Sequence, residues 1–266
     1  CIAIAIMTFF GGIFLGQESG FGSLQSYLLF IIAVIALGLF IMVERKRKSP
    51  LIKFAIFKNK IFTLSLLSAV LIFASNFFVN VVIPFYLQDA RKLSASYAGL
   101  LMMVFPLLMV VGAPLSGYLT DKIGPGILTF GGLLLLCCTS LMYMFLDMNS
   151  PIWYYVIATA IMGLGNALFQ SPNNTMVMSS VEKQDLGVAG SMNSFARNLG
   201  MVIGIALSTT ILYRGMSEAY GERVTTYLAN RPDIFIVGMR ETFFVAFLLC
   251  VAAFILTILR FRKTTK

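Results

Sequence analysis

The chain has 266 residues, of which 59% are hydrophobic and only 12% are charged. A soluble domain carries about twice that charged fraction, so the composition excludes an ordinary soluble protein and indicates that most of the chain is solvated by lipid. The net charge of +9 does not call for nucleic acid as a partner, because cationic loops set the orientation of membrane proteins. There is no histidine, and the four cysteines lie in apolar runs without metal or disulfide spacing, so we expect no cofactor and no metal.

Two apolar stretches open the chain, at about 1–16 and 25–43, and together they form the first predicted domain, 1–43. The first stretch has no basic start and no small-residue cleavage site, so we interpret it as a membrane span that is cut short, not as a signal peptide. A basic segment follows at 44–60. Its second part, 51–60, places lysines between apolar residues, which predicts a short amphipathic helix on the membrane surface.

Six more apolar stretches follow, and each is about as long as the 20 residues with which an α-helix crosses a bilayer. We therefore predict an all-α polytopic membrane protein with about eight transmembrane helices. The last six would form one bundle over 61–259, followed by a cytoplasmic tail at 260–266. The predicted spans are 61–87, 97–119, 126–146, 152–177, 187–213 and 241–259, with a longer polar loop at 214–240 before the last of them.

The basic residues predict the orientation. With eight spans the connections alternate sides, and most of the 20 lysines and arginines fall on the side of the segment 44–60 and of the tail 260–266. The side richer in basic residues faces the cytoplasm in membrane proteins. We therefore expect a multi-pass protein of the cytoplasmic membrane with its C-terminus inside.

A decapeptide from Gly117 to Gly126 must turn the chain between two predicted spans. Gly124 and Gly126 permit backbone angles that other residues avoid. Pro125 prevents the first helix from continuing. Asp121 can accept hydrogen bonds from the free N–H groups of a nearby helix start and favours the positive end of its dipole.

Polar side chains inside predicted spans are costly unless they face protein or water, so they locate the interior of the bundle. Asn76, Asn80 and Pro84 are spaced by four and share one helix face. This face could border a cavity, or its amides could join helices by interhelical hydrogen bonds; the sequence leaves both interpretations open. The candidate cavity-lining residues are Asn76, Phe77, Asn80, Tyr86, Asn166, Gln170 and Asn173.

Proline and glycine residues inside the spans predict bends and close helix contacts. We expect Pro172 to interrupt its helix near the cytoplasmic side. Every acidic residue falls in a loop or at the end of a predicted span, so these spans hold no mid-membrane carboxylate of the kind that marks proton pathways. The candidate bend and packing residues are Pro106, Pro114, Gly163, Gly165, Pro172, Gly200 and Gly204.

The turn resembles the signature cytoplasmic loop of the major facilitator superfamily, Gly-x-Leu-x-Asp-(Arg/Lys)-x-Gly. The usual basic pair after the last glycine is replaced by Pro125 and Gly126, as in the degenerate copy found in the second half of such transporters. The pattern is carried here by Gly117, Leu119, Asp121, Lys122 and Gly124.

Further residues extend the resemblance to the fourteen-span drug:proton antiporter (EmrB/QacA-like) branch of that superfamily. One departure is Leu186, where the branch often has arginine. The residues that continue the pattern are Tyr97, Ala98, Gly99, Pro106, Gly163, Gly165, Pro172, Gly187, Gly190 and Gly200.

The resemblance implies the two central spans and the C-terminal bundle of a secondary transporter that works by alternating access. It implies a small apolar substrate, protons as the coupling ion, the lipid bilayer as solvent and an N-terminal bundle of the same protein as partner. The turn residues Gly117, Asp121, Lys122 and Gly124 would then act as a conformational lock.

Two other functions stay open at this point. The same fold could export a specific metabolite or lipid, or the chain could be a non-transporting membrane module that binds a partner. A membrane enzyme has little support, because no nucleophile–base pair and no set of metal ligands is present.

Overall fold

The computed structural model describes residues 24–46, 54–228 and 231–264, with a few positions between 4 and 15. It divides the chain into two compact units, Cys1–Ala55 and Ile56–Lys266. The described part is helical and contains no strand, which confirms the all-α prediction. Most of the predicted first span, and residues 47–53 of the basic segment, lie outside the described residues.

The first unit contains helix α2, Leu24–Lys46, which corresponds to the predicted span 25–43. Ala33 and Ala36 are buried, whereas Val34 is 71% exposed. An apolar helix with apolar side chains exposed is stable where lipid replaces water around it. Its crossing of a membrane stays a prediction.

The second unit holds six helices or helix pairs that are long and apolar enough to cross a bilayer, among the residues that the structure describes. These six correspond one to one to the predicted spans of the bundle. The elements are η1 (Phe54–Lys58), α3 (Lys60–Pro84), η2 (Phe85–Ala90), α4 (Ala95–Met102), α5 (Val104–Ile123), α6 (Pro125–Met144), α7 (Ile152–Ser179), η3 (Lys183–Asp185), α8 (Leu186–Tyr220) and α9 (Pro232–Thr264).

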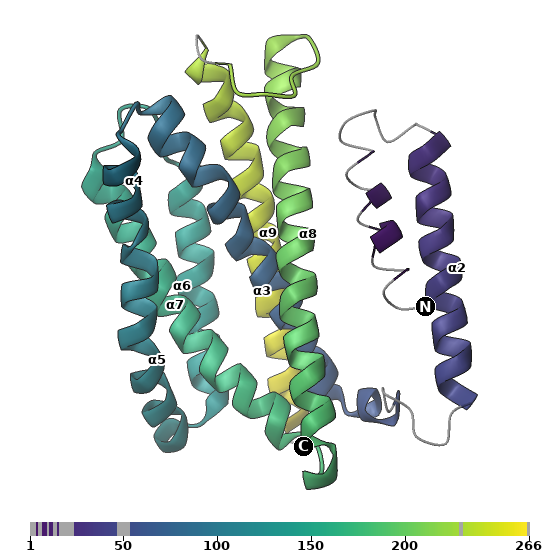
Figure 1. Ribbon diagram of the computed structural model, residues 1–266. Helices are drawn as coiled ribbons and strands as arrows, with labels where there is room; N and C mark the ends of the chain where they lie inside the picture. The colour runs from purple at the N-terminus through teal and green to yellow at the C-terminus, as the bar shows by residue number, and fades with distance from the viewer. Residues whose placement is uncertain are drawn as a thin grey trace. The chain divides into compact units, whose positions relative to one another are not determined.

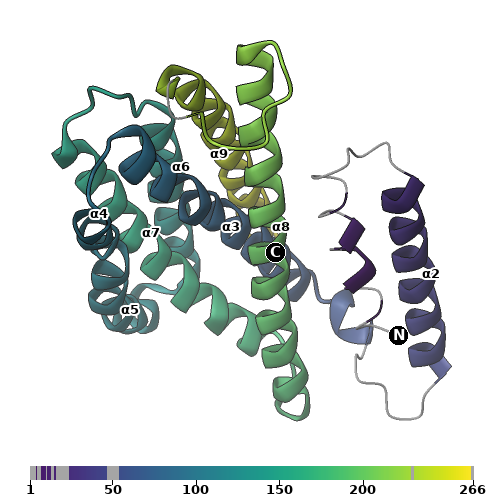
Figure 2. The same cartoon turned by 45° about the horizontal axis from the view of Figure 1, so that its top comes forward.

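Helices α3 and α7 lie between α5 on one side and α8 on the other in both views of the second unit (Figure 1, Figure 2). Helix α3 packs against α8 and α9, and α6 packs against α7 and α9. An aromatic core joins these layers: Tyr143 of α6 stacks on Phe243 of α9 with ring centroids 5.1 Å apart. Phe78 and Phe169 are fully buried beside them.

Glycines allow the closest of these contacts. Gly200 and Gly204 of α8 lie against the backbone of α3 at Val70 and Ala74, so a β-carbon at either glycine would overlap main-chain atoms. Gly163 of α7 also lies close to the carbonyl of Phe105 in α5. Small residues at such points are what lets helices approach in a membrane.

The turn between α5 and α6 is built around Gly124, whose φ of +88° is accessible to glycine and strained for other residues. Pro125 occupies the first turn of α6, where its missing N–H costs nothing. Gly126 does not have a positive φ, so the expectation of an unusual backbone angle there is wrong. Its missing side chain instead leaves room for the ring of Phe261 from α9.

Two expected interruptions are also wrong. Helix α7 runs without a break through Pro172, because neighbouring helices in a bundle can satisfy or bury the carbonyl that a proline frees. The polar loop expected at 214–240 covers only residues 221–231, because α8 continues to Tyr220 and α9 begins at Pro232. Gly221 ends α8 in a left-handed conformation with φ +85°.

Other predicted segments differ in local detail. The span predicted at 97–119 consists of α4 and α5, which meet at Met103, three residues before Pro106. The amphipathic helix expected over 51–60 is described only in part, as the short 3₁₀ helix η1. Asn59 then caps α3, because its side chain accepts hydrogen bonds from the N–H groups of Ile61 and Phe62.

Candidate functional site

A reciprocal pair of amides joins α3 to α7 in the interior of the second unit. Asn76 Nδ2 donates to Asn166 Oδ1 at 2.5 Å, and Asn166 Nδ2 donates to Asn76 Oδ1 at 3.1 Å. Asn166 Nδ2 also donates to the carbonyl of Met162 at 3.0 Å. Both asparagines are buried, and each finds the hydrogen-bond partners that a buried amide needs.

Two further amides extend this pair toward the surface of the unit. Asn80 is exposed and donates to the carbonyl of Asn76 at 3.1 Å. Gln170 is half-buried, and its Nε2 reaches Asn166 Oδ1 at 3.4 Å. We call these four residues, Asn76, Asn80, Asn166 and Gln170, the amide cluster. It offers uncharged donors and acceptors on α3 and α7.

A partly open pocket lies beside Asn80 and has about 30 Å³ of free volume. A drug-sized ligand needs a site of roughly 300–1,000 Å³, so this pocket is one wall of such a site at most. Apart from Asn80, Thr159 and the hydroxyl of Tyr155, the wall is apolar and aromatic, with two flexible methionines. The lining residues are Val79, Asn80, Ile83, Met102, Phe105, Tyr155, Thr159 and Met162.

The other predicted cavity residues lie apart from the amide cluster. Phe77 is half-buried and faces Gly204 of α8. Asn173 is buried nearer the C-terminal end of α7, and its Nδ2 donates to the carbonyl of Ser65 at 3.2 Å. Whether these two border a cavity in another conformation stays a prediction.

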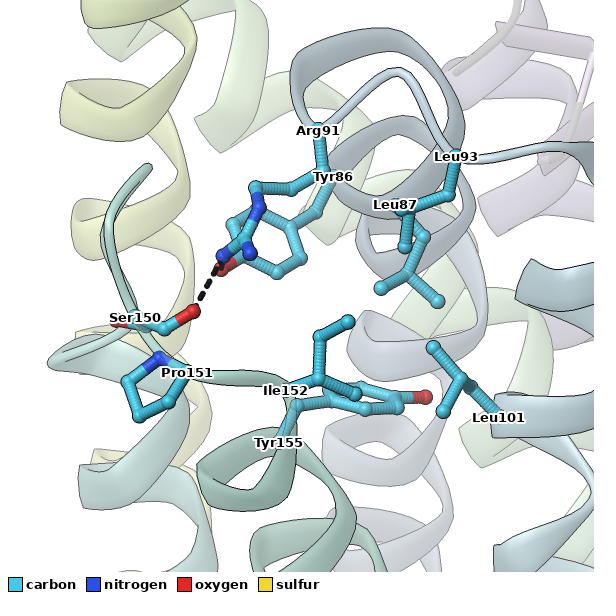
Figure 3. A pocket seen from close by; sticks show the side chains of 9 residues that line it. All are labelled: Tyr86, Leu87, Arg91, Leu93, Leu101, Ser150, Pro151, Ile152 and Tyr155. Carbon is cyan, nitrogen blue, oxygen red and sulfur yellow. Dashed lines mark hydrogen bonds between the residues drawn. The ribbon is translucent and has the colours of Figure 1, made fainter.

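Tyr86 lies in η2, just beyond the opposite end of α3, and lines a small pocket (Figure 3). Its hydroxyl donates to the carbonyl of Asp147 at 2.8 Å. Arg91 Nη1 donates to the carbonyl of Ser150 at 2.5 Å and to the Tyr86 hydroxyl at 3.1 Å. These bonds fasten the π-helical turn η2, which follows Pro84, to the loop between α6 and α7. Tyr86 therefore anchors a loop in this structure.

The residues proposed as a conformational lock lie at the turn between α5 and α6. Asp121 is exposed, and the described residues provide it with no hydrogen bond. The start of α6 has no side-chain cap, so Asp121 does not cap that helix, and its interaction with another helix start stays a prediction. Lys122 lies over the ring of Tyr118 at 4.6 Å. Gly117 faces Ser171 of α7. The carboxylate of Asp121 is thus open to a partner from elsewhere.

Charged groups in the described part pair only near the helix ends. The three ion pairs are Arg214–Glu218, Arg231–Asp233 and Arg240–Asp147, at 2.7, 2.9 and 3.8 Å. Their side chains are largely exposed, so solvent screens these pairs and they contribute little to stability. The carboxylate of Asp233 raises the pKa of Arg231, which lies in the loop. The described part shows no such pair at the amide cluster.

Sequence reasoning missed Arg260 and Ser65. Arg260 was assigned to the cytoplasmic tail, because an arginine after a long apolar run normally extends toward water. In the structure α9 continues to Thr264 and Arg260 is 1% exposed. Its Nη1 donates to Ser65 Oγ at 2.9 Å and to Asn173 Oδ1 at 3.1 Å. No pattern in the sequence distinguishes this arginine from Arg262 and the lysines that follow it.

Comparison with known proteins decides the family. The family described as Major Facilitator Superfamily matches residues 1–205 and 65–266, which together cover the whole chain. The chain belongs to the major facilitator superfamily. This membership and the six long apolar helices establish a multi-pass membrane protein.

Several curated proteins are similar to the chain. The riboflavin transporter RibZ of Clostridioides difficile (strain 630) is 29% identical over 89% of the chain and 50% of its own length. The multidrug transporter protein MdtP of Bacillus subtilis (strain 168) is 29% identical over 82% of the chain and 40% of its own length. The MFS-type transporter YcnB of the same bacterium is 28% identical over 96% of the chain and 54% of its own length. The chain thus spans about half the length of these relatives, which are named as transporters and not as enzymes.

Proposed function

We propose that the chain supplies the C-terminal portion of a fourteen-span drug:proton antiporter that exports small apolar compounds by alternating access. In this proposal residues 1–43 are the two central spans, 44–60 is a cytoplasmic linker and 61–259 is the C-terminal bundle. The superfamily match over the whole chain and the multidrug name of the relative MdtP support this assignment. The distribution of lysine and arginine supports a cell-membrane location with the C-terminus inside.

The observation that carries the proposal is the amide cluster beside the partly open pocket. An uncharged, largely apolar wall with a few amides suits compounds that are mostly apolar and need a few hydrogen bonds for orientation. The wall is incomplete, because the pocket has only about 30 Å³ of free volume. An N-terminal bundle facing α3 and α7 would complete it, as in alternating-access transporters.

Proton coupling is assigned to that N-terminal bundle. An antiporter needs a protonatable group within the membrane. The acidic residues of this chain lie in loops or near helix ends, except Glu241, which is exposed and lies more than two turns into α9. The coupling test is to neutralise, in the complete protein, each loop acid of this chain and then each span acid of the N-terminal bundle. This assignment would be refuted if neutralising Glu18, Asp89 or Asp147 abolished proton coupling while every span acid of the N-terminal bundle proved dispensable.

Dye efflux from cells that express the complete coding frame tests the function itself. We expect Asn166→Leu to reduce efflux strongly, because it removes the central amide of the cluster. Leu134→Ala is the control, because Leu134 is half exposed on α6 and lines none of the described pockets. No efflux by the wild-type protein, or equal efflux by both variants, would argue against a multidrug exporter.

A second candidate is the export of one specific metabolite by the same fold. The similarity to RibZ, whose name specifies riboflavin, favours this candidate. A polar heteroaromatic compound would also match the amides of the cluster. Competition separates the two: a specific exporter is inhibited by one chemical class only, whereas a multidrug exporter is inhibited by structurally unrelated apolar dyes.

A further inference from the structure

Arg260 is a charged residue in the interior of a membrane bundle, and such residues are rare and functional by default. It lies near the C-terminal end of α9 and is among the largest fully buried side chains. A guanidinium cannot lose its charge in a protein, so the bundle must solvate it with acceptors at this point. Two of these acceptors come from other helices: Ser65 of α3 and Asn173 of α7.

The three residues form a closed triangle of hydrogen bonds. Arg260 Nη1 donates to Ser65 Oγ at 2.9 Å and to Asn173 Oδ1 at 3.1 Å. Asn173 Nδ2 donates in turn to the main-chain carbonyl of Ser65 at 3.2 Å. The oxygen and the nitrogen of the Asn173 amide are therefore both held by hydrogen bonds. These bonds connect α3, α7 and α9 at one point.

The triangle holds α7 directly after its weakest point. Pro172 has no N–H, so α7 lacks the backbone hydrogen bond that would join this position to the carbonyl of Leu168. The part before the proline carries Asn166 and Gln170 of the amide cluster. The part after it starts with Asn173, which is fixed by Arg260.

Other polar contacts hold the same end of α7. Asn193 of α8 donates to Asn174 Oδ1 at 2.7 Å. Asn59, the cap of α3, donates to the carbonyl of Ser180 at 2.6 Å. These contacts lie nearer the surface than the triangle, which alone involves a buried charge.

We propose that Arg260 is a positioning residue for transport: it fixes the segment 173–179 of α7 against α3 and α9. Through α7 it sets the orientation of the amide cluster on the other side of Pro172. Arg260 does not line the pocket beside the amide cluster, and its hydrogen bonds to α3 and α7 go to Ser65 and Asn173. The link to transport rests on the proposed function, whereas the placement of α7 does not.

The test uses Arg260→Met and the double variant Arg260→Met/Asn173→Leu in the complete protein. Replacing a buried charged network by apolar residues of similar volume is often neutral or stabilising, so the double variant should keep its thermal stability. Arg214→Met is the control, because Arg214 is an exposed arginine paired with Glu218 on α8.

Two measurements separate positioning from a merely structural role. Hydrogen–deuterium exchange of the peptide covering 173–180 should rise several-fold in both Arg260 variants and stay unchanged in Arg214→Met. The kcat for dye export should fall about tenfold in the double variant, with KM within a factor of about two. The proposal would be overturned if residues 173–180 of the Arg260 variants exchanged at the wild-type rate. It would also be overturned if the stable double variant kept the wild-type kcat. If the wild-type protein exports no compound, the proposed function fails, and the exchange measurement still decides the placement of α7.

Discussion

At the scale of single residues, the buried pair of Asn76 and Asn166 is the feature with the clearest energetic consequence. Each amide donates a hydrogen bond to the other, so removing one side chain leaves the other without its partner. A buried polar group that loses its partner costs about 1–3 kcal/mol, whereas replacing both partners by apolar groups can be nearly neutral. Interhelical hydrogen bonds in membranes average about 0.6 kcal/mol in net value.

We therefore predict that Asn166→Leu and Asn76→Leu each destabilise the complete protein, and that the double variant is less destabilised than the sum of the two. Thermal unfolding in detergent, analysed as a double-mutant cycle, measures this coupling. A coupling of at least about 0.6 kcal/mol is expected. Strictly additive effects would show that the two amides do not depend on each other.

The sequence indicated the polar positions of the site but not their pairing. Asn76 and Asn80 share a helix face in the sequence pattern, yet Asn76 is buried in contact with Asn166 of α7 and Asn80 is exposed. The partner Asn166 is 90 positions away, and such a distance carries no local signal. Tertiary packing, not helix periodicity, decides which amide is satisfied within the protein.

At the scale of the helices, the contact of α8 with α3 depends on glycine. Gly200 faces the carbonyl of Val70, and main-chain atoms cannot move aside as a flexible side chain can. A large residue at Gly200 must push α8 away from α3, and overpacking of this kind costs about 1–3 kcal/mol or more.

We predict that Gly200→Leu lowers the unfolding temperature and the yield of folded protein. Gly187→Leu is the matched control on the same helix, because a β-carbon at Gly187 meets no atom within 4 Å. Size-exclusion chromatography and thermal unfolding of both variants check the prediction. Equal stability of the two variants would mean that α8 does not depend on this contact.

The turn between α5 and α6 yields a prediction about rate. Asp121 is exposed and its carboxylate can interact with a helix start outside the described contacts. Asp121→Asn keeps the shape and removes the charge–dipole interaction, worth about 0.3–1 kcal/mol at an exposed position. We expect a lower transport rate with nearly unchanged substrate affinity. A large loss of affinity at an unchanged rate would exclude the proposed lock.

The helix order was predictable because lipid-facing helices are apolar over a length fixed by the bilayer. The helix ends were not predictable, because a helix can continue through polar residues after it leaves the lipid. Helix α8 runs past Arg214 to Tyr220, where an exposed Arg214–Glu218 pair one turn apart supports it. Likewise Pro172 ended no helix, because the surrounding helices and not the local sequence hold α7 together at that point.

At the scale of the whole molecule, the second unit is half of a proposed transport pathway. Helices α3 and α7 lie between α5 and α8, and they carry the amide cluster toward an incomplete pocket (Figure 1). Composition predicted the membrane fold, and the turn around Asp121 predicted the superfamily. Neither could predict the pocket, because it is formed by residues of α3, α4, α5 and α7 that meet only in the folded bundle.

Substrate-protected labelling of a cysteine at Asn80 tests the central claim most directly. In the complete protein without its native cysteines, Asn80→Cys should react with a charged, water-soluble thiol reagent, and a transported compound should slow that reaction. The matched control is Ile157→Cys: Ile157 is 44% exposed and does not line the pocket, whereas Tyr155 and Thr159 on the same helix do. We predict fast, substrate-protected labelling at residue 80 and almost none at residue 157. Equal labelling at both positions, or labelling at residue 80 that no transported compound slows, would contradict the assignment of this face to the transport pathway.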